Sequence, residues 1–307
     1  MHNKRVMVVG GTGLFGQPVV QAFQRKGFEP VILSHDEKKA QKRFSGSCNI
    51  RYADVTNPGS LKGIFDDISS LHINLNTLIE EDIYKVVADG VQNLIGEAKD
   101  QHLKLITYTS QATVSETHRW FPLINARLDA EKHIIHSGIP YLIIRPTHFM
   151  EAMMFFIRGN QLTPVKDFDI PIQWISGEEF GDFVADFHVS GKEVNNIIYL
   201  KGPETYTLQQ ALEIYKQHSE KNIRMNVLNM NMLRSIAQFS NNLEMQFVAS
   251  YLEYLNSVRE VAGYDENQHG FLTLSTSLEE WTRLQHEKKL FEWSSHETSN
   301  SPDVNKA

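Results

Sequence analysis

The chain has 307 residues, of which 41% are hydrophobic and 22% are charged, and its formal net charge is −7. These proportions are ordinary for a globular protein with a substantial core, in one large domain or two. The mild acidity argues against a nucleic-acid-binding protein, which normally carries a clustered basic surface.

A single cysteine, Cys48, excludes an internal disulfide, and the histidines form no cluster with the spacing of a metal site. The first residues carry no apolar signal core, and no apolar run reaches the length of a membrane span. We therefore expect a cytoplasmic protein without a bound metal, a nucleic-acid partner or a membrane anchor.

Short apolar runs alternate with longer helical patterns through the first half, which is typical of a parallel sheet with crossover helices. The runs predict six strands, at Arg5–Val9, Pro30–Leu33, Ile50–Tyr52, Leu71–Leu75, Leu103–Thr109 and Tyr141–Ile144. The patterns between them predict helices at Leu14–Lys26, Glu37–Phe44, Ser60–Asp66, Glu81–Asp100 and Leu123–Ser137. Gly27 and Gly138 follow two of these helices as C-terminal caps. The expected fold is α/β, a Rossmann-type doubly wound parallel sheet.

The rhythm changes after about residue 150, where prolines punctuate short segments. Three helical patterns then follow, at Leu208–Lys221, Met232–Asn241 and Leu243–Ala262. We predict a Rossmann domain over residues 1–150 and a smaller, mainly helical C-terminal lobe over 151–293, interwoven with the first. Residues 294–307 are polar and aperiodic, and are expected to form a disordered tail.

The first predicted strand runs into a glycine-rich segment and then an apolar helix. Glycine at position 10 allows a tight turn, Gly13 lets the backbone approach a diphosphate, and Gly16 lets the helix pack closely. The helix N-terminus offers free N–H groups and a partial positive charge to the phosphates. Glycines also serve plain structural turns, but the strand and helix around these favour an NAD(P) site. Its expected contacts are Gly10, Thr12, Gly13, Leu14, Phe15 and Gly16.

Residues at the end of the second predicted strand contact the adenosine ribose and so determine the preference for NAD or NADP. Asp36 stands at roughly the distance of a 2′-hydroxyl ligand, but it also suits the N-cap of the next helix. Ser34, His35 and Lys38, or Lys39 in its place, offer hydroxyl and cationic groups to a 2′-phosphate. The segment therefore slightly favours NADP over NAD.

Several ordered motifs resemble the atypical short-chain dehydrogenase/reductases of the NmrA-like family over roughly residues 4–285. They are the glycine turn, Asp54-Val55-Thr56, Thr109-Ser110, Ala126–Glu131, Ser137–Tyr141, Arg145–Glu151, and Gly202-Pro203-Glu204 with Thr207-Leu208. The resemblance implies that Asp54 and Val55 lie on the adenine side of the dinucleotide. It also implies cofactor contacts from Asn76, Arg127, Pro146, Thr147 and Phe149.

One departure concerns the catalytic helix. Reductases of the wider superfamily carry Tyr-x-x-x-Lys there, in which the lysine holds the nicotinamide ribose and the tyrosine passes the proton. This chain has Leu123 and Arg127 at the two positions. Arginine can bind ribose hydroxyls but does not titrate, and leucine cannot transfer a proton.

Other residues near predicted strand ends are candidate proton donors: Tyr108, Ser110, His118 and His148. Each has a plainer interpretation, since Tyr108 is expected to point into a helix layer, Ser110 to cap its strand and His118 to lie at the surface. The segment Met150–Phe156 is rich in methionine and phenylalanine, and it is either the wall of a small apolar pocket or interlobe core. Trp120 and Phe121 form either a lid over that pocket or a staple at the helix start.

The leading hypothesis is an NAD(P)-dependent oxidoreductase that acts on a small apolar carbonyl, alkene or quinone-like substrate. Arg127 and Ser110 would orient the ribose and the substrate. The alternatives are a non-catalytic redox sensor that signals through a protein partner, and an assembly subunit that contacts its partner through an exposed apolar face of the C-terminal lobe. The replacement of the tyrosine and lysine favours both alternatives.

Overall fold

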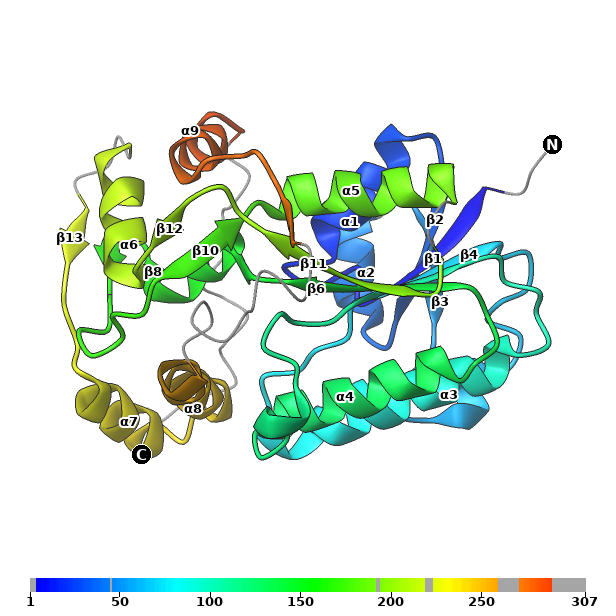
Figure 1. Cartoon of the computed structure of the whole chain (residues 1–307), viewed down its shortest axis with the longest axis horizontal. Coiled ribbons are helices and arrows are strands. Elements are labelled where there is room, and N and C mark those ends of the chain that lie inside the picture. Colours follow the sequence, from blue (N-terminus) through cyan, green and yellow to red (C-terminus); the bar gives the residue numbers. More distant parts are fainter. Residues whose placement is uncertain (1–3, 45, 192–193, 219–222, 259–270, 289–307) are drawn as a thin grey trace, which may run out of the picture.

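The computed structural model describes residues 4–44, 46–191, 194–218, 223–258 and 271–288. Its centre is an eight-stranded parallel sheet in the order β14-β11-β6-β5-β4-β1-β2-β3 (Figure 1). The strands are β1 (Arg5–Val9), β2 (Glu29–Ser34), β3 (Asn49–Tyr52), β4 (Ser70–Ile73), β5 (Ile106–Thr109), β6 (Tyr141–Pro146), β11 (Asn196–Lys201) and β14 (Phe271–Thr273).

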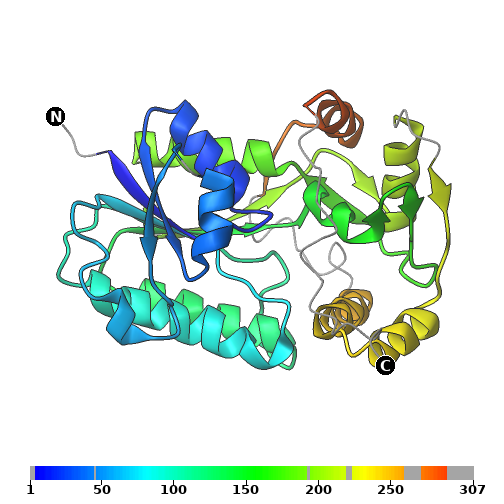
Figure 2. The same cartoon turned by 180° about the vertical axis from the view of Figure 1, so that it is seen from behind.

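Helices cover both faces of this sheet (Figures 1 and 2). One face is covered by α1 (Gln17–Arg25), α2 (Glu37–Phe44) and α5 (Gly177–Ser190), and the other by α3 (Gly90–Ala98) and α4 (Pro122–Ile135). A 3-10 turn at Glu80–Asp82 and a π-helical turn at Tyr84–Asp89 lead into α3. The predicted doubly wound fold is thereby confirmed.

Successive residues of β1 show why these strands read as continuous apolar runs. Val6 and Val8 pack in the cluster with α1 and α5, whereas Met7 and Val9 pack in the cluster with α3 and α4. Because both faces are covered, every side chain of a central strand meets a helix layer. At the ends of α1 and α4, Gly27 and Gly138 have φ values of 74° and 76°, as expected of the predicted caps.

Two predictions about the elements are wrong. The sheet has eight strands rather than six, because β11 pairs with β6 and β14 pairs with β11. Both strands come from the part of the chain assigned to the C-terminal lobe, so the sheet does not end at residue 150. The predicted helix at 60–66 is only a 3-10 turn, Pro58–Leu61, followed by turns. Gly63, with a φ of 72°, turns the chain away from helical geometry.

Helix α5 was absent from the sequence prediction and lies directly on α1. A Cβ added at Gly181 would lie 2.7 Å from the carbonyl oxygen of Pro18, so the two helix backbones touch at this point. The helix that follows the glycine-rich segment is therefore braced by a helix from the second half of the chain (Figure 1).

The C-terminal lobe combines helices with two three-stranded sheets, β12-β10-β7 and β13-β9-β8. Its strands are β7 (His148–Phe149), β8 (Ile157–Arg158), β9 (Gln161–Leu162), β10 (Ile172–Ile175), β12 (Thr205–Tyr206) and β13 (Arg224–Met225). Its helices are the 3-10 segment Met150–Phe156, α6 (Leu208–Gln217), α7 (Met230–Phe239), α8 (Leu243–Val258) and α9 (Leu278–Lys288). The predicted tail at 294–307 lies outside the described residues, and within them no helix is long and apolar enough to cross a membrane.

Candidate functional site

The glycine turn joins β1 to α1 at the carboxyl edge of the sheet. A Cβ on Gly10, whose φ is 80°, would overlap the carbonyl oxygen of Asn74, and a Cβ on Gly16 would overlap that of Gly10. Between them, the Gly13 amide donates to the Gly10 carbonyl at 3.0 Å, which closes a tight turn. Gly10 and Gly16 are therefore required by close backbone contacts.

The N-terminus of α1 is suited to an anion. Among the described residues, no side chain caps this helix, whose N-cap is Gly16 and whose first turn contains Pro18. Uncapped N–H groups at a helix start bind phosphate oxygens well. From the same turn, the Phe15 ring stacks on Phe149 of β7, with centroids 4.8 Å apart. Phe15 and Phe149 thus link the glycine turn to the strand that follows β6.

The residues that the sequence analysis expected to contact the adenosine ribose lie at the end of β2. Asp36 accepts a hydrogen bond from the Lys39 amide at 2.9 Å, so its carboxylate serves as the N-cap of α2. The buried Ser34 hydroxyl is bonded to the backbone of Asp36. His35 and Lys38 are exposed. Asp36 was expected either to bind the ribose 2′-hydroxyl or to cap the next helix, and its hydrogen bond shows that it caps the helix.

Arg43 is a cation that the sequence analysis did not consider. It lies in the last turn of α2, and its guanidinium donates to the carbonyl oxygen of Thr12 in the glycine turn. A positive charge therefore lies beside the glycine turn. The available signal was helical spacing, because residue 43 lies one turn beyond Lys39 on the same helix.

After β3, the Asp54 carboxylate accepts from both the amide and the hydroxyl of Thr56 at 2.8 Å. Partial burial raises the pKa of Asp54, but these hydrogen bonds more than offset that effect, so the pKa lies below its usual value. The Val55 side chain packs against Gly90 of α3, and its carbonyl accepts from Asn93 at 2.9 Å. Asn76, beyond β4, is exposed.

Arg127 of α4 points to the end of β5. It is 7% exposed, and its Nη1 donates to the Thr109 carbonyl at 2.8 Å. Its Nε is buried without a hydrogen-bond partner among the described residues, and so is the hydroxyl of Thr147 beyond β6. Buried polar groups are normally satisfied, so orphaned ones call for an explanation such as a ligand. Among the described residues, the Tyr108 hydroxyl and Gln285 Oε1 are also buried without a partner, so two of the four such atoms fall on residues that the sequence assigned to the dinucleotide.

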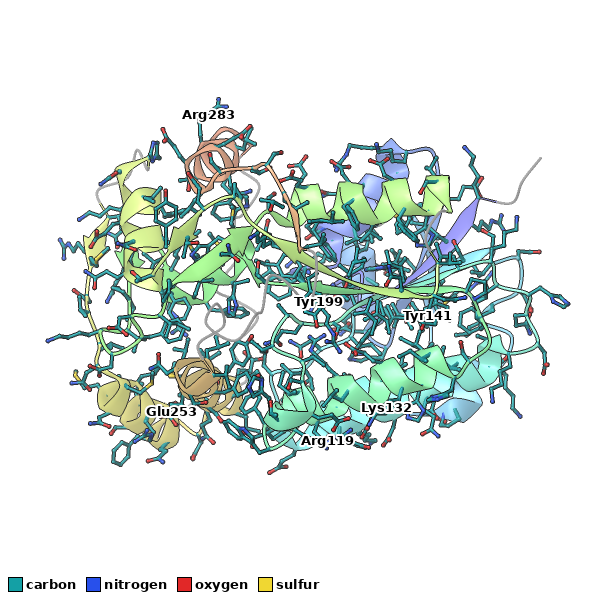
Figure 3. The ribbon with its side chains drawn as sticks, in the orientation of Figure 1. Arg119, Lys132, Tyr141, Tyr199, Glu253 and Arg283 are labelled. Carbon is teal, nitrogen blue, oxygen red and sulfur yellow. The ribbon has the colours of Figure 1, made fainter. Side chains whose placement is uncertain are left out.

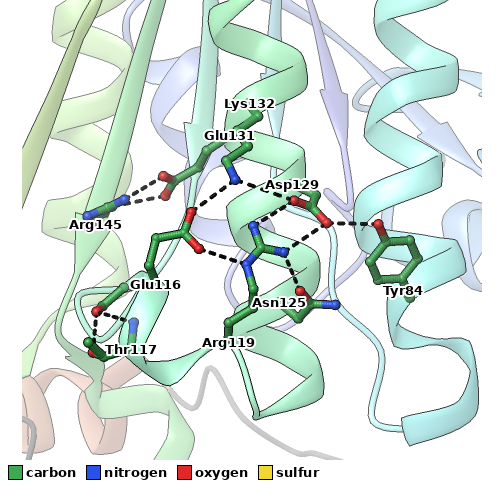
Figure 4. Close-up of polar contacts among 10 residues, drawn as sticks. Tyr84, Glu116, Thr117, Arg119, Asn125, Asp129, Glu131, Lys132 and Arg145 are labelled. Carbon is green, nitrogen blue, oxygen red and sulfur yellow. Dashed lines mark hydrogen bonds and ion pairs between the residues drawn. The ribbon is translucent and has the colours of Figure 1, made fainter.

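Ser110 lies in a closed polar network. Its hydroxyl donates to Glu131 of α4 at 2.5 Å, and Glu131 makes a two-pronged ion pair with Arg145 of β6 at 2.6 and 3.0 Å (Figure 4). Arg145 also donates to the hydroxyl of Tyr199 on β11. The Ser110 proton is thus directed to a carboxylate in the layer between sheet and helix, and not toward the edge of the sheet.

A second ion-pair network lies on the outer side of α4. Arg119 contacts Asp129 at 3.0 Å and Glu116 at 2.9 Å, while Asp129 accepts from the Tyr84 hydroxyl and Glu116 accepts from Lys132 (Figures 3 and 4). Glu116 and Lys132 are exposed and Arg119 and Asp129 are only partly buried, so the network contributes little to stability. It holds the loop before α4 against the helix.

A buried chain of hydrogen bonds lies on the opposite face of β4 and β5. His72 bonds to Thr107 at 2.8 Å, and Thr107 bonds to His188 of α5 at 2.9 Å. His188 also bonds to Ser70, and His72 lies 3.5 Å from Thr109. Burial lowers the pKa of both histidines to about 3, so both rings are neutral at neutral pH.

The remaining proton-donor candidates are placed as follows. Tyr108 points into the α3/α4 layer as predicted, and burial raises its pKa to about 12. The His118 ring bonds to the Thr113 carbonyl at 2.8 Å and is half-buried rather than on the open surface. His148 stacks on Tyr251 of α8, with ring centroids 5.9 Å apart.

The sequence analysis did not identify two residues at the end of β5, Gln111 and Tyr251. Gln111, two residues beyond the end of β5, is buried, and its Nε2 donates to the Tyr251 hydroxyl at 2.9 Å and to Thr113 at 2.7 Å. The contact brings α8 of the C-terminal lobe to the end of β5. No local sequence signal links positions 111 and 251, because the pairing depends on how the lobe folds back.

The segment beyond β7 is partly core. Met150 and Met153 are fully buried in the main cluster, which agrees with interlobe core for these two residues. Glu151 is also buried, where it accepts from the Gly177 amide and from the Trp281 indole at 3.0 Å. Burial raises its pKa to about 7. Phe155 is exposed.

Trp120 and Phe121 differ in their surroundings. Trp120 is 62% exposed, whereas Phe121 is buried and stacks on Tyr254 of α8 with centroids 4.3 Å apart. Phe121 is also the N-cap residue of α4, so it fixes the start of that helix against the lobe, as a staple would. In the described part of the chain, no three metal-binding side chains come together.

The C-terminal lobe has an exposed apolar face, as the assembly hypothesis requires. Met232, Ile236 and Phe239 repeat at helical spacing along α7 and are 48%, 43% and 90% exposed. Leu243, at the start of α8, continues the face and is half exposed. Apolar surface of this kind often marks a contact with another protein.

Comparisons with known proteins agree with this architecture. The NmrA-like family model matches residues 2–297. The photosystem II assembly factor Ycf39 of Synechocystis sp. is 23% identical over 261 residues, which cover 80% of this chain and 77% of that protein. The chloroplastic divinyl chlorophyllide a 8-vinyl-reductase of Arabidopsis thaliana is 22% identical over 230 residues, covering 64% of this chain and 53% of the reductase. This chain therefore spans about half the length of that relative.

A solved structure shows the same fold. The triphenylmethane reductase of Citrobacter sp., complexed with NADP(H), superimposes with a TM-score of 0.70 at 18% identity. The match covers 92% of this chain and 99% of that one.

Proposed function

The chain belongs to the NmrA-like family, and we propose that it is an NAD(P)-dependent reductase acting on a small, mostly apolar carbonyl, alkene or quinone-like substrate. The observation that carries the proposal is the glycine turn, in which Gly10 and Gly16 exclude any side chain beside an uncapped helix N-terminus. Such a turn at the carboxyl edge of a parallel sheet fits a dinucleotide diphosphate.

The residues around the turn fit the rest of the dinucleotide. We assign Asp54 and Val55 to the adenine side, and Arg127 and Thr147, with their unpartnered buried atoms, to the nicotinamide ribose. Arg43, beside Thr12, supports a preference for NADP, since its guanidinium suits a 2′-phosphate together with His35 and Lys38. The carboxylate of Asp36 is engaged in capping, which removes the usual argument for NAD.

The bound dinucleotide would supply a hydride, and the protein would position the acceptor. Arg127 would hold the ribose, while Phe149 and Phe15 would form an apolar wall. Ser110 would act as a positioning residue by anchoring the Glu131–Arg145 pair beside the end of β5. The relatives that reduce a vinyl group or a triphenylmethane compound support an unsaturated, apolar acceptor.

Calorimetric titration with NAD⁺, NADH, NADP⁺ and NADPH tests the binding half of the proposal, and oxidation of the bound coenzyme by quinones, enones and triphenylmethane dyes tests the catalytic half. We expect NADPH to bind most tightly and at least one acceptor to be reduced. The proposal would be overturned if none of the four dinucleotides bound to the protein.

A non-catalytic function is the second candidate, favoured by Leu123 at the tyrosine position and by the exposed apolar face of α7. In that case the protein would bind the dinucleotide and act through a protein partner, and the similarity to an assembly factor supports it. It predicts different affinities for oxidised and reduced coenzyme with no turnover of any acceptor. The location in the cytoplasm stays a prediction that cell fractionation would test.

A further inference from the structure

A phenol from the C-terminal lobe reaches the end of β5. The Tyr251 hydroxyl accepts a hydrogen bond from the Gln111 amide at 2.9 Å, although 140 positions separate the two residues. We propose that Tyr251 is the proton donor of the reaction and takes the place of the helix tyrosine that this chain lacks at Leu123. This inference rests on the reductase function proposed above.

Ring stacking places Tyr251 against β7. One face of its ring stacks on His148 of β7, and the next residue, Phe149, stacks on Phe15 of the glycine turn. Since successive side chains of a strand point to opposite faces, Tyr251 packs on the α3/α4 side of β7 and Phe15 on the α1/α5 side. The carboxyl ends of β5 and β6, where a Rossmann sheet binds its ligands, lie at this strand.

Gln111 prepares the phenol for proton transfer. Its Nε2 donates to both Tyr251 and Thr113, and the second bond, at 2.7 Å, fixes the orientation of the amide. An N–H group donated to the phenol oxygen stabilises the negative charge that develops there as the proton leaves. Tyr251 is half-buried, and ring contacts with His148 and Phe247 hold it in place.

Three of the four candidates from the sequence are less well placed for this step. The Ser110 hydroxyl donates to Glu131, and Tyr108 is fully buried in the α3/α4 layer. The His118 ring is held by the Thr113 carbonyl and packs edge-on against Tyr254.

The proposed step balances for a quinone. A hydride from the dinucleotide adds two electrons and a hydrogen to the quinone, the O–H bond of Tyr251 breaks, and its proton forms an O–H bond on the reduced oxygen. Solvent water then returns a proton to the phenolate. A cationic triphenylmethane dye differs, because its central carbon accepts the hydride and the product is neutral without any proton.

This difference provides the test. We expect Tyr251→Phe to lower the rate of NADPH-dependent reduction of 2-methyl-1,4-naphthoquinone about 100-fold or more, the usual effect of losing a positioned acid. The rate with crystal violet should stay within about twofold of wild type. The matched control is Tyr254→Phe on the same helix, whose hydroxyl lies 3.5 Å from the Thr113 carbonyl, and it should leave both rates unchanged.

A second measurement needs no turnover. Binding of the same naphthoquinone to dinucleotide-free protein can be followed by tryptophan fluorescence, since Trp174 packs edge-on against His148. Loss of one donated hydrogen bond in Tyr251→Phe should weaken this binding about five- to tenfold, with no change in crystal violet binding.

Three outcomes would overturn the assignment of Tyr251: an equal loss with dye and quinone, no loss with the quinone, or no binding of the naphthoquinone to the wild-type protein. If the wild type reduces neither acceptor, the reductase function fails. The binding measurement then still decides whether Tyr251 faces the acceptor.

Discussion

The glycine turn and the end of β5 lie at the same edge of the sheet, but they are built differently. The turn is specified by backbone contacts, with Gly10 and Gly16 packed against carbonyl groups that exclude any side chain. The end of β5 is specified by buried side chains, above all Arg127, Glu131 and Arg145. A turn that is fixed by its backbone tolerates little substitution, whereas a strand end that is built from side chains can exchange them.

The largest expected effect is at the turn. Gly16→Ala should weaken NADPH binding roughly 100-fold or more in calorimetry, because the added methyl group overlaps the Gly10 carbonyl. The matched control is Gly96→Ala on α3, where an added Cβ meets no atom within 4 Å. Equal affinities for the two variants would show that the turn is not specified by its backbone.

At the end of β5, Glu131→Gln should lower the free energy of unfolding by about 3–5 kcal/mol. The reason is that Arg145 would stay charged and buried without its ion-pair partner. Chemical denaturation measures the change. Glu116→Gln removes the same charge from the solvated network on the outer side of α4 and should change stability little. Similar losses in both would remove the distinction between the buried and solvated pairs.

Acid should lower the stability of the folded protein through the buried histidines His72 and His188. Their folded pKa values, about 3, lie below the usual 6.5, so the unfolded chain takes up protons first. Stability is therefore fully present above pH 6.5 and falls as the pH is lowered toward 3. Glu151 has the opposite sign, since a pKa raised to about 7 favours the folded state at low pH and loses that contribution as pH rises from 4.5 to 7.

Thermal unfolding between pH 4 and pH 7 tests both signs. The two histidines should outweigh the one carboxyl group, so the melting temperature should fall in acid. In Glu151→Gln the opposing contribution is gone, and the fall should become steeper. A melting temperature that is constant or rises toward pH 4 would contradict the histidine assignment.

Arg127→Ala should weaken NADPH binding about tenfold, as expected for the loss of one charge-assisted contact to a ribose. Arg127→Lys should recover part of the loss, because it restores the charge without the fork of donors. Coenzyme titration of both variants measures the effect. An unchanged affinity in Arg127→Ala would move the ribose contact elsewhere along the edge.

The smallest effect is expected for Asp36→Ala. The cap of α2 is lost, at a cost of about 1 kcal/mol in unfolding free energy, while the affinity for NADPH stays the same. A clear loss of NAD⁺ affinity would instead identify Asp36 as a ribose ligand.

The sequence predicted those parts of the fold that depend on local patterns of residues. The six strands from β1 to β6 and the glycine turn follow from hydrophobic runs and from glycines at fixed spacing, which depend on neighbours in the chain. Helix α5 and strand β11 were missed because their burial comes from distant partners, α1 and β6.

The same reasoning explains the site. Arg127 and Thr147 could be located by their place in a motif, but Tyr251 could not, since its contact with Gln111 spans the whole C-terminal lobe. Ser110 directly follows β5, as its motif predicted, but the direction of its hydroxyl depends on Glu131 and could not be predicted from the motif.

The close contact between Gly181 and Pro18 has a consequence for how such a chain can change over time. With α5 lying on α1, and β11 and β14 extending the sheet beyond β6, each half of the chain completes the packing of the other. A cut near residue 150 would leave both halves with uncovered apolar faces. The C-terminal half therefore cannot be exchanged as a cassette, and change in either half has to arise by substitution within one co-folding unit.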